Sequence, residues 1–168
     1  MNRFYLKVYE KNRAFLSARN HLKNTVYFAD KIATCALCMI YAAVCVYAVF
    51  YGGFFRRDAL RVFAFPAVCL AFTTLLRALV NEKRPYERGV TPLFEKSRKG
   101  RSFPSRHLSC AAVIAGIALR YVPALGGVAA ALAAVMFYTR FACGWHFPRD
   151  LLGGALLGAA CALPAFFI

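Results

Sequence analysis

Three polar clusters interrupt an otherwise apolar chain, and their side chains suit the chemistry of phosphate groups. They comprise Arg77, Arg84 and Pro85 in the first cluster, residues 104–107 (Pro-Ser-Arg-His) in the second, and Arg140, His146 and Asp150 in the third. Arginine stays charged at any relevant pH, and its planar guanidinium donates paired hydrogen bonds to phosphate oxygens. The clusters therefore predict a site for an anionic phosphoryl group.

Phosphoryl transfer depends mostly on positioning the phosphate and on stabilising the charge of its non-bridging oxygens. We therefore expect Arg77, Arg84 and Arg140 to hold the phosphate in place of a metal ion. Ser105 follows Pro104 at the expected start of a helix, where exposed N–H groups and the helix dipole favour an anion. Ser105 is accordingly predicted to donate a hydrogen bond to the phosphate and not to attack it.

Two histidines supply the groups that a covalent route needs, a nucleophile and an acid for the leaving oxygen. Asp150 follows His146 by four residues, so its carboxylate can accept from one ring nitrogen and leave the other free to attack. His146 is therefore the predicted nucleophile, and Asp150 is predicted to orient it. His107, on the opening turn of the helix after Ser105, is the predicted general acid.

The composition puts these clusters in a membrane. Hydrophobic residues make up 61% of the 168 and charged residues only 17%, which is too apolar for an ordinary soluble domain of this length. One spanning helix needs about 20 apolar residues, so five or six crossings fit at most. The net charge of +15 favours anionic partners, and membrane burial makes lipid phosphate and membrane lipids better partners than nucleic acid.

The pattern of apolar segments predicts a single all-α domain, residues 1–168, built as a polytopic transmembrane helical bundle. The expected spans are 31–54, 59–80, 105–122, 125–142 and 149–167, which form a catalytic bundle over 29–168. Residues 1–28 are basic and amphipathic, so they are expected to form an interfacial helix at the headgroup surface. Residues 81–104 are dense in charge, Gly and Pro and predict one long functional loop. Counting the crossings brings all three clusters to one membrane face.

The clusters resemble the signature of the type 2 phosphatidic acid phosphatase and vanadium haloperoxidase superfamily. Its motifs read K-x(6)-R-P, P-S-G-H and S-R-x(5)-H-x(3)-D, and the chain is similar to them in order and spacing from Arg77 to Asp150. The resemblance implies a helical bundle, lipid phosphatase activity with no essential metal, a phosphohistidine at His146 and acid catalysis at His107. The small, apolar chain favours the phosphatase branch of this superfamily, and we expect no cofactor.

The chain departs from these motifs at three positions. Arg77 replaces the usual Lys and keeps its charge, and Thr139 replaces Ser and keeps a hydroxyl. Arg106 replaces a Gly whose backbone N–H approaches the phosphate in this family, so its side chain either points away or joins the phosphate-binding arginines. A metal site at His107 and His146 is disfavoured, because only Asp150 accompanies them and the arginines repel a cation.

The basic run in the long loop has a simpler interpretation. Lys96, Arg98, Lys99 and Arg101 have the pattern of a solvated, headgroup-facing set of charges. The positive-inside rule adds an orientation, because basic residues of the N-terminal stretch and of this loop outnumber those expected on the opposite side. Those opposite residues are Arg56, Arg57, Arg61 and Arg120. The rule predicts a multi-pass protein, which we expect in a bacterial cell membrane, with the site toward the cytoplasm.

The predicted activity is hydrolysis of a phosphomonoester or diphosphate on a lipid such as phosphatidate, phosphatidylglycerophosphate or a polyprenyl diphosphate. The alternative is a non-catalytic membrane protein whose arginines bind anionic lipid headgroups. The two hypotheses differ in their need for His146, because headgroup binding requires the arginines alone.

Overall fold

The computed structural model describes residues 3–52 and 57–167, which fold into helices joined by short turns and one long loop. The elements are α1 (Arg3–Ser17), α2 (Asn20–Gly52), α3 (Arg57–Val80), η1 (Pro85–Arg88), α4 (Arg106–Tyr121), α5 (Pro123–Ala142), α6 (Pro148–Ala162) and η2 (Leu163–Phe166). The predicted all-α bundle is confirmed. Arg56, expected to follow the first span, lies outside the described residues.

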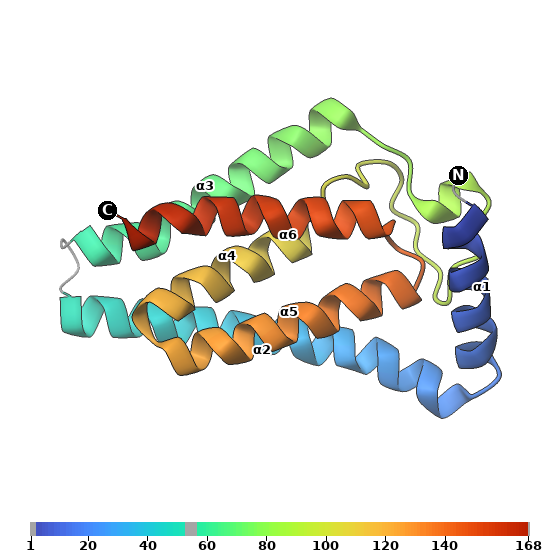
Figure 1. The fold of residues 1–168 in the computed structure, drawn as a ribbon, viewed down its shortest axis with the longest axis horizontal. Helices are drawn as coiled ribbons and strands as arrows, with labels where there is room; N and C mark the ends of the chain where they lie inside the picture. Colours follow the sequence, from blue (N-terminus) through green and yellow to red (C-terminus); the bar gives the residue numbers. More distant parts are fainter. Residues whose placement is uncertain (1–2, 53–56, 168) are drawn as a thin grey trace.

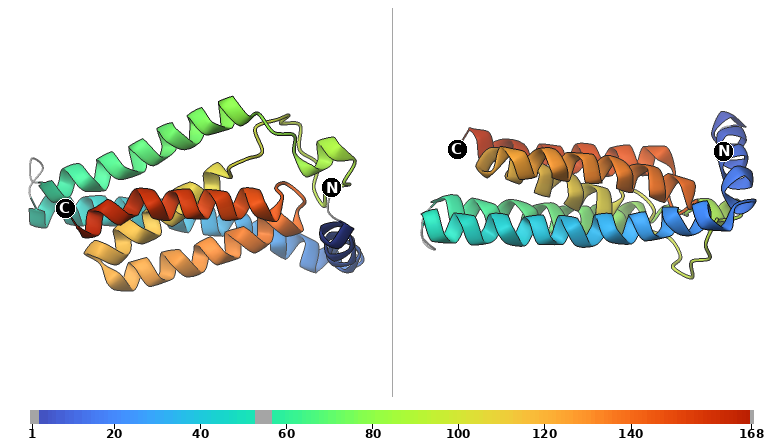
Figure 2. Two further views of the ribbon diagram at one scale, coloured as in Figure 1. Left: turned by 45° about the horizontal axis from the view of Figure 1, so that its top comes forward. Right: turned by 90° about the horizontal axis from the view of Figure 1, so that it is seen from below.

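Helices α2 to α6 run along the long axis of the molecule, and α1 lies across one end of them (Figure 1). Helix α4 is central, because it packs against α2, α3, α5 and α6. The long loop between α3 and α4 and the turn between α5 and α6 both lie at the α1 end, whereas the C-terminus lies at the opposite end (Figures 1 and 2). The order of the helices thus brings the three polar clusters to a single end of the bundle, as expected.

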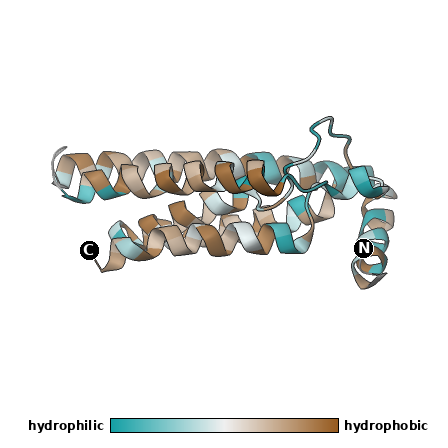
Figure 3. Ribbon diagram, turned by 90° about the horizontal axis from the view of Figure 1, so that it is seen from above, coloured by the Kyte–Doolittle hydropathy of each residue, from teal (hydrophilic) through white to brown (hydrophobic). Residues whose placement is uncertain are grey.

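The exterior of the bundle is that of a membrane protein. Large apolar side chains such as Met39, Phe50, Leu79 and Leu156 are exposed along the helices. Figure 3 shows hydrophobic residues over the length of the helices and hydrophilic ones concentrated at the ends and in the long loop. An exposed apolar surface of this extent is expected to face lipid. The predicted integral membrane location is therefore confirmed.

Four of the five predicted spans are long and apolar enough to cross a membrane, namely Asn20–Tyr51, Arg57–Arg88, Pro123–Ala142 and Pro148–Phe166. Helix α4 differs, because it has only 16 residues. At about 1.5 Å per residue it is roughly 24 Å long, less than the hydrocarbon core of about 30 Å. It also begins further inside the bundle than α6 does (Figures 1 and 2). The residues at its start therefore lie deeper than the other helix ends.

The first break between helices comes earlier than residue 28, the boundary predicted between the interfacial helix and the bundle. Helix α1 ends at Ser17 and α2 begins at Asn20, so residues 20–28 extend the first span. Their charge had suggested a headgroup location, but the ammonium of Lys23 lies 4.9 Å from the centre of the Phe94 ring. Val26 on the same face is buried against a cluster that includes Leu93. Contact with the long loop thus stabilises this part of the helix.

Glycines allow α4 and α6 to approach closely. A Cβ atom added to Gly154 would lie 2.4 Å from the carbonyl oxygen of Ser105, and one added to Gly158 would lie 2.2 Å from that of Ser109. Because the obstructing atoms are backbone atoms, they cannot rotate away as a side chain would. Small residues at such positions allow membrane helices to pack backbone against backbone. This contact fixes the start of α4, which carries the second polar cluster, against α6.

We expect Gly158→Ala to destabilise the bundle by about 1–3 kcal/mol, because the added methyl group overpacks the α4–α6 contact. Gly127→Ala in α5 is the matched control, since a Cβ there meets nothing within 4 Å. The control should change stability by less than about 1 kcal/mol, in the stabilising direction, because alanine favours helix. Reversible unfolding in detergent measures both, and equal stability of the two variants would contradict the packing described.

Candidate active site

A cavity of about 230 Å³ lies at the α1 end of the bundle, and residues from all three clusters line it. Its wall is formed by Arg77, Arg84, Lys96, Ser97, Arg98, Arg106, His107, Arg140 and His146. The structure thus brings together both predicted histidines and all four predicted arginines. Six of the nine lining side chains are cationic and none is a carboxylate. Such a wall favours an anion.

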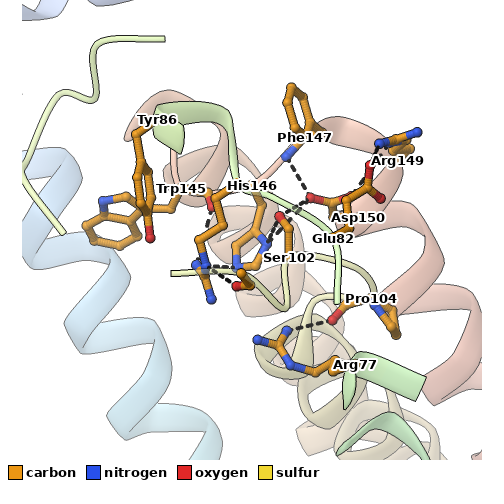
Figure 4. A network of polar contacts seen from close by, with 12 residues as sticks. Arg77, Glu82, Tyr86, Ser102, Pro104, Trp145, His146, Phe147, Arg149 and Asp150 are labelled. Atoms are coloured by element: carbon orange, nitrogen blue, oxygen red, sulfur yellow. Dashed lines mark hydrogen bonds and ion pairs between the residues drawn. The ribbon is translucent and has the colours of Figure 1, made fainter. Parts of the chain in front are cut away.

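Two of the predicted phosphate-binding arginines, Arg77 and Arg84, each donate to a backbone carbonyl oxygen. Arg77, in the last turn of α3, donates from Nη1 to the carbonyl oxygen of Pro104 over 2.7 Å (Figure 4). Arg84, just before η1, donates from Nε to the carbonyl oxygen of Gly100 over 3.1 Å. Because a guanidinium has five N–H groups, these contacts orient it and leave other donors for an anion.

His146 lies in the turn between α5 and α6, and both of its ring nitrogens have neighbours. Its Nε2 atom is 3.4 Å from Nη1 of Arg84, on the cavity side. Its Nδ1 atom is 3.4 Å from the hydroxyl of Ser102. The imidazole is buried, so its orientation is set by these contacts and by packing (Figure 4).

Asp150 approaches His146 as predicted, but a direct hydrogen bond between them is not present. The carboxylate Oδ2 lies 3.7 Å from Nδ1 of His146, beyond hydrogen-bond distance. The hydroxyl of Ser102 donates to that same Oδ2 and so lies between the two groups. The backbone N–H of Phe147 also donates to Oδ2, over 3.1 Å, which caps the start of α6. His146, Ser102 and Asp150 therefore form a chain of contacts, in place of the predicted direct pair of His146 and Asp150.

Ser102 was not predicted from the sequence. It belongs to the long loop, outside the three motifs, and only its position two residues before Pro104 connects it with the second cluster. Ser102 is buried, and its N–H donates to the carbonyl oxygen of Glu82 over 2.8 Å. The loop backbone thus holds this hydroxyl against Asp150.

The surroundings of His146 favour its neutral form. Burial lowers the pKa of His146 to about 4, the nearby Asp150 opposes this change, and the charge of Arg84 adds to it. A lowered pKa means that the proton is lost as the pH rises through about 4. The ring is therefore uncharged near neutral pH, and one of its nitrogens carries a free electron pair.

Ser105 lies at the start of α4 as predicted, but its backbone N–H is not available to an anion. That N–H donates to the carbonyl oxygen of Asp150 over 2.8 Å and ties α4 to α6. The hydroxyl of Ser105 is different, because it is buried and has no hydrogen-bond partner among the described residues. A buried polar atom without a partner is unusual. The hydroxyl, and not the N–H, is the group of Ser105 that remains free to donate.

Arg140 has a partner that the motifs do not contain. Its Nη2 donates to Oδ2 of Asp30 on α2 over 3.1 Å, and the hydroxyl of Thr139 lies 3.1 Å from the other oxygen. All three residues are buried, and Nε of Arg140 has no partner among the described residues. Asp30 is the single acid between Glu10 and Asp58, so its place directly before the predicted span 31–54 was the available signal.

The basic run of the loop is only partly the solvated surface that was expected. All four of its residues are exposed, but Lys96 and Arg98 line the cavity. The ammonium of Lys96 lies 3.4 Å from the centre of the Trp145 ring. Loss of water around this ammonium and the charges of Arg140 and Arg84 lower the pKa of Lys96 to about 8. Lys96 is therefore mostly protonated near neutral pH and adds a positive charge to the cavity.

Helix α1 supports the turn that carries His146. Gly144 has a φ of +70°, which glycine adopts without strain, and a Cβ there would lie 2.4 Å from the hydroxyl oxygen of Tyr9. The Tyr9 hydroxyl donates to the carbonyl oxygen of Thr91 over 2.9 Å. Tyr5 packs against Phe147, with ring centres 5.2 Å apart. The predicted interfacial helix thus contacts both the loop and the turn of the site.

The fold and the cavity describe a helical membrane protein with a site for a phosphoryl group, and the sequence comparisons agree. The chain belongs to the PAP2 superfamily, whose family model matches residues 58–168 and so includes all three clusters. The predicted family is confirmed, and with it the predicted class, a phosphoric ester hydrolase of the membrane. No protein with a curated function matches the sequence significantly.

Two crystal structures share the fold. LpxE from Aquifex aeolicus is 21% identical, with a TM-score of 0.70 over 95% of this chain and 94% of that one. A transmembrane PAP2-type phosphatidylglycerolphosphate phosphatase from Bacillus subtilis is 20% identical, with a TM-score of 0.52 over 98% of this chain and 95% of that one. At these identities the likeness concerns the fold.

The buried pair of Asp30 and Arg140 leads to a prediction about the cavity. We expect Asp30→Asn to weaken inhibition by vanadate, a phosphate analogue, about tenfold, because Arg140 loses the charge that orients it. Asp58→Asn is the matched control, since Asp58 pairs with Arg61 at the opposite end of the bundle. Inhibition constants measured in detergent test this. A control as weakened as Asp30→Asn would contradict a specific role for the pair.

Proposed function

We propose that this chain removes a phosphoryl group from a lipid, as a phosphomonoester or a diphosphate, through a covalent intermediate on His146. The observation that carries the proposal is the convergence of two histidines and five arginines on one cavity in a membrane-embedded bundle. Arginines alone would suit a headgroup-binding protein. The buried, neutral His146 beside them is what favours catalysis.

The first step is attack by Nε2 of His146 on phosphorus. With a proton on Nδ1 directed at Ser102, and the Ser102 hydroxyl directed at Asp150, the electron pair is on Nε2, the ring nitrogen that lies beside Nη1 of Arg84. Asp150 then stabilises the positive charge that develops on the ring during attack. Ser102 and Asp150 are positioning residues in this mechanism, because they act through His146.

The phosphate oxygens are held by Arg77, Arg84 and Arg140, and the hydroxyl of Ser105 donates a further hydrogen bond. The buried Ser105 hydroxyl and Nε of Arg140, both without a partner among the described residues, support this assignment. Their hydrogen-bonding capacity is satisfied by a bound phosphoryl group. Stabilising the non-bridging oxygens in this way is the main catalytic demand of phosphoryl transfer.

His107 is the proposed general acid for the leaving oxygen. It lines the polar cavity together with His146, and it also lines a neighbouring, mostly apolar cavity of about 190 Å³. Leu37, Leu70 and Ile114 contribute to the apolar wall. A bound phosphate neutralises the cationic surroundings of His107 and so favours its protonated form. A leaving group with an apolar body next to His107 supports a lipid as the substrate.

The name of one structural neighbour supports the same substrate class. This neighbour is called a phosphatidylglycerolphosphate phosphatase, and phosphatidylglycerophosphate is among the candidate substrates proposed for this chain. Phosphatidate and polyprenyl diphosphates are the other candidates. All share a terminal phosphoryl group on an apolar body.

We expect His146→Ala to reduce phosphate release from lipid substrates at least about a thousandfold, because the nucleophile is lost. His21→Ala is the matched control, since His21 is an exposed histidine of α2. Purified protein in detergent, assayed for inorganic phosphate on several lipid phosphates, measures the effect. Activity that survives in His146→Ala, or that a chelator removes from the wild type, would reject this mechanism in favour of another.

We also propose that the active site faces the cytoplasm of a bacterial cell. The α1 end of the bundle carries the basic loop and the N-terminal helix, whereas the described basic residues of the opposite end are Arg57, Arg61 and Arg120. Positive charge collects on the cytoplasmic side of multi-pass proteins.

Labelling of intact cells with a membrane-impermeant maleimide tests this orientation. Ser97→Cys, in the exposed loop, should be labelled above the wild-type background only after permeabilisation. Arg120→Cys, exposed at the other end of α4, should be labelled in intact cells. The reverse pattern would show that the site faces outward.

A further inference from the structure

A second basic cavity adjoins the candidate active site. It measures about 340 Å³ and is lined by Thr74, Arg77, Arg98, Lys99, Arg101 and Arg106. Three of these residues, Arg77, Arg98 and Arg106, also line the cavity that contains His146. The two cavities therefore share a wall of guanidinium groups. The proposed chemistry uses only the first of them.

The charge of the second cavity is not compensated within the described residues. No carboxylate forms an ion pair there with Arg98, Lys99, Arg101 or Arg106. Other basic residues nearby do have partners, since Arg88 and Arg149 both pair with Glu82. Several like charges around one cavity repel one another, so binding an anion between them is favourable.

The loop that carries these charges is held in a defined conformation. Arg101 has a φ of +52°, a left-handed conformation that is uncommon for a residue with a side chain. Hydrogen bonds fix the backbone on both sides of it. The N–H of Gly100 donates to Glu87 over 2.8 Å, and the N–H of Ser102 donates to the carbonyl oxygen of Glu82 over 2.8 Å. The side chain of Arg101 thus projects from a fixed point.

Arg106 connects the cavities, because it lines the catalytic cavity, the second basic cavity and the apolar cavity. It is next to His107, the proposed acid for the leaving oxygen. A group bound by Arg106 in the second basic cavity therefore lies next to the cavity that is proposed to hold the terminal phosphoryl group. This is also the residue at which the chain departs from the glycine of the family motif.

We propose that the second cavity binds a second phosphoryl group of the same substrate, so that the chain prefers lipid diphosphates to lipid monophosphates. This inference rests on the proposed function. A directly linked diphosphate fits because Arg77, Arg98 and Arg106 face both cavities and can bridge two neighbouring phosphoryl groups. Lys99 and Arg101 then contact the inner phosphate alone.

The reaction on such a substrate leaves the lipid with one phosphate. The bond between the terminal phosphorus and the bridging oxygen breaks as Nε2 of His146 bonds to that phosphorus. The electron pair stays on the bridging oxygen, which takes a proton from His107 and leaves as the lipid monophosphate. Water then attacks the phosphorus on His146, gives a proton back to His107, and releases inorganic phosphate.

The double variant Lys99→Gln with Arg101→Gln tests the inference, with farnesyl diphosphate and farnesyl phosphate as substrates in neutral detergent micelles. We expect kcat/KM for the diphosphate to fall about tenfold, mainly through KM, and that for the monophosphate to fall less than about twofold. The matched control, Lys83→Gln with Lys11→Gln, removes the same charge from exposed residues that line neither cavity. It should leave both values unchanged.

The ratio of the two kcat/KM values in one preparation is independent of the fraction of folded protein. An equal fall for both substrates, no fall for either, or the same change in the control would overturn the second subsite while leaving the phosphatase in place. A fall that is equal for both substrates and appears only with anionic phosphatidylglycerol in the micelles would assign the cavity to a neighbouring lipid headgroup, which also overturns it. Wild-type protein inactive on both substrates would reject the proposed function and this inference together.

Discussion

Six cationic side chains line a cavity that has no carboxylate in its wall, and the repulsion between them is the constraint on which the rest of the site depends. The surrounding bundle is apolar, so this repulsion is screened less than at an ordinary surface. Three of the six side chains have oxygen acceptors. The carbonyl oxygens of Pro104 and Gly100 accept from Arg77 and Arg84, and Asp30 pairs with Arg140. These partners orient the guanidinium groups and still leave donors directed at the cavity.

This constraint explains why the long loop and α1 are so firmly attached to the bundle. A backbone carbonyl oxygen can accept a hydrogen bond from an arginine of the site only if the loop holds that carbonyl group in place. Three hydrogen bonds to backbone carbonyl oxygens anchor the loop. Arg84 donates to Gly100, the N–H of Ser102 donates to Glu82, and the hydroxyl of Tyr9 on α1 donates to Thr91. Helix α1 is thus more than a membrane-surface segment, because its tyrosines also pack on the turn that carries His146.

The sequence was sufficient for the parts of the site that depend on local spacing. Arg77, Arg84, His107 and His146 were predicted because each lies at or near the end of an expected span, and the ends of consecutive spans meet at one membrane face. Ser102 and Asp30 were missed because their contacts link segments far apart in the chain, Ser102 to Asp150 and Asp30 to Arg140. The start of α2 at Asn20 was not predicted for the same reason, since the contact of Lys23 with the Phe94 ring of a distant loop has no local signal.

The depth at which the short α4 begins sets where its first residues lie relative to the cationic cavity. Helix α4 begins deeper in the bundle than α6 does (Figure 1). Its start is fixed there by the bond from the N–H of Ser105 to the carbonyl oxygen of Asp150 and by close contact at Gly154. His107, one turn or less from that point, consequently lies where the polar cavity meets an apolar one. The depth of α4 thus places one histidine at the junction of a cationic cavity and an apolar one.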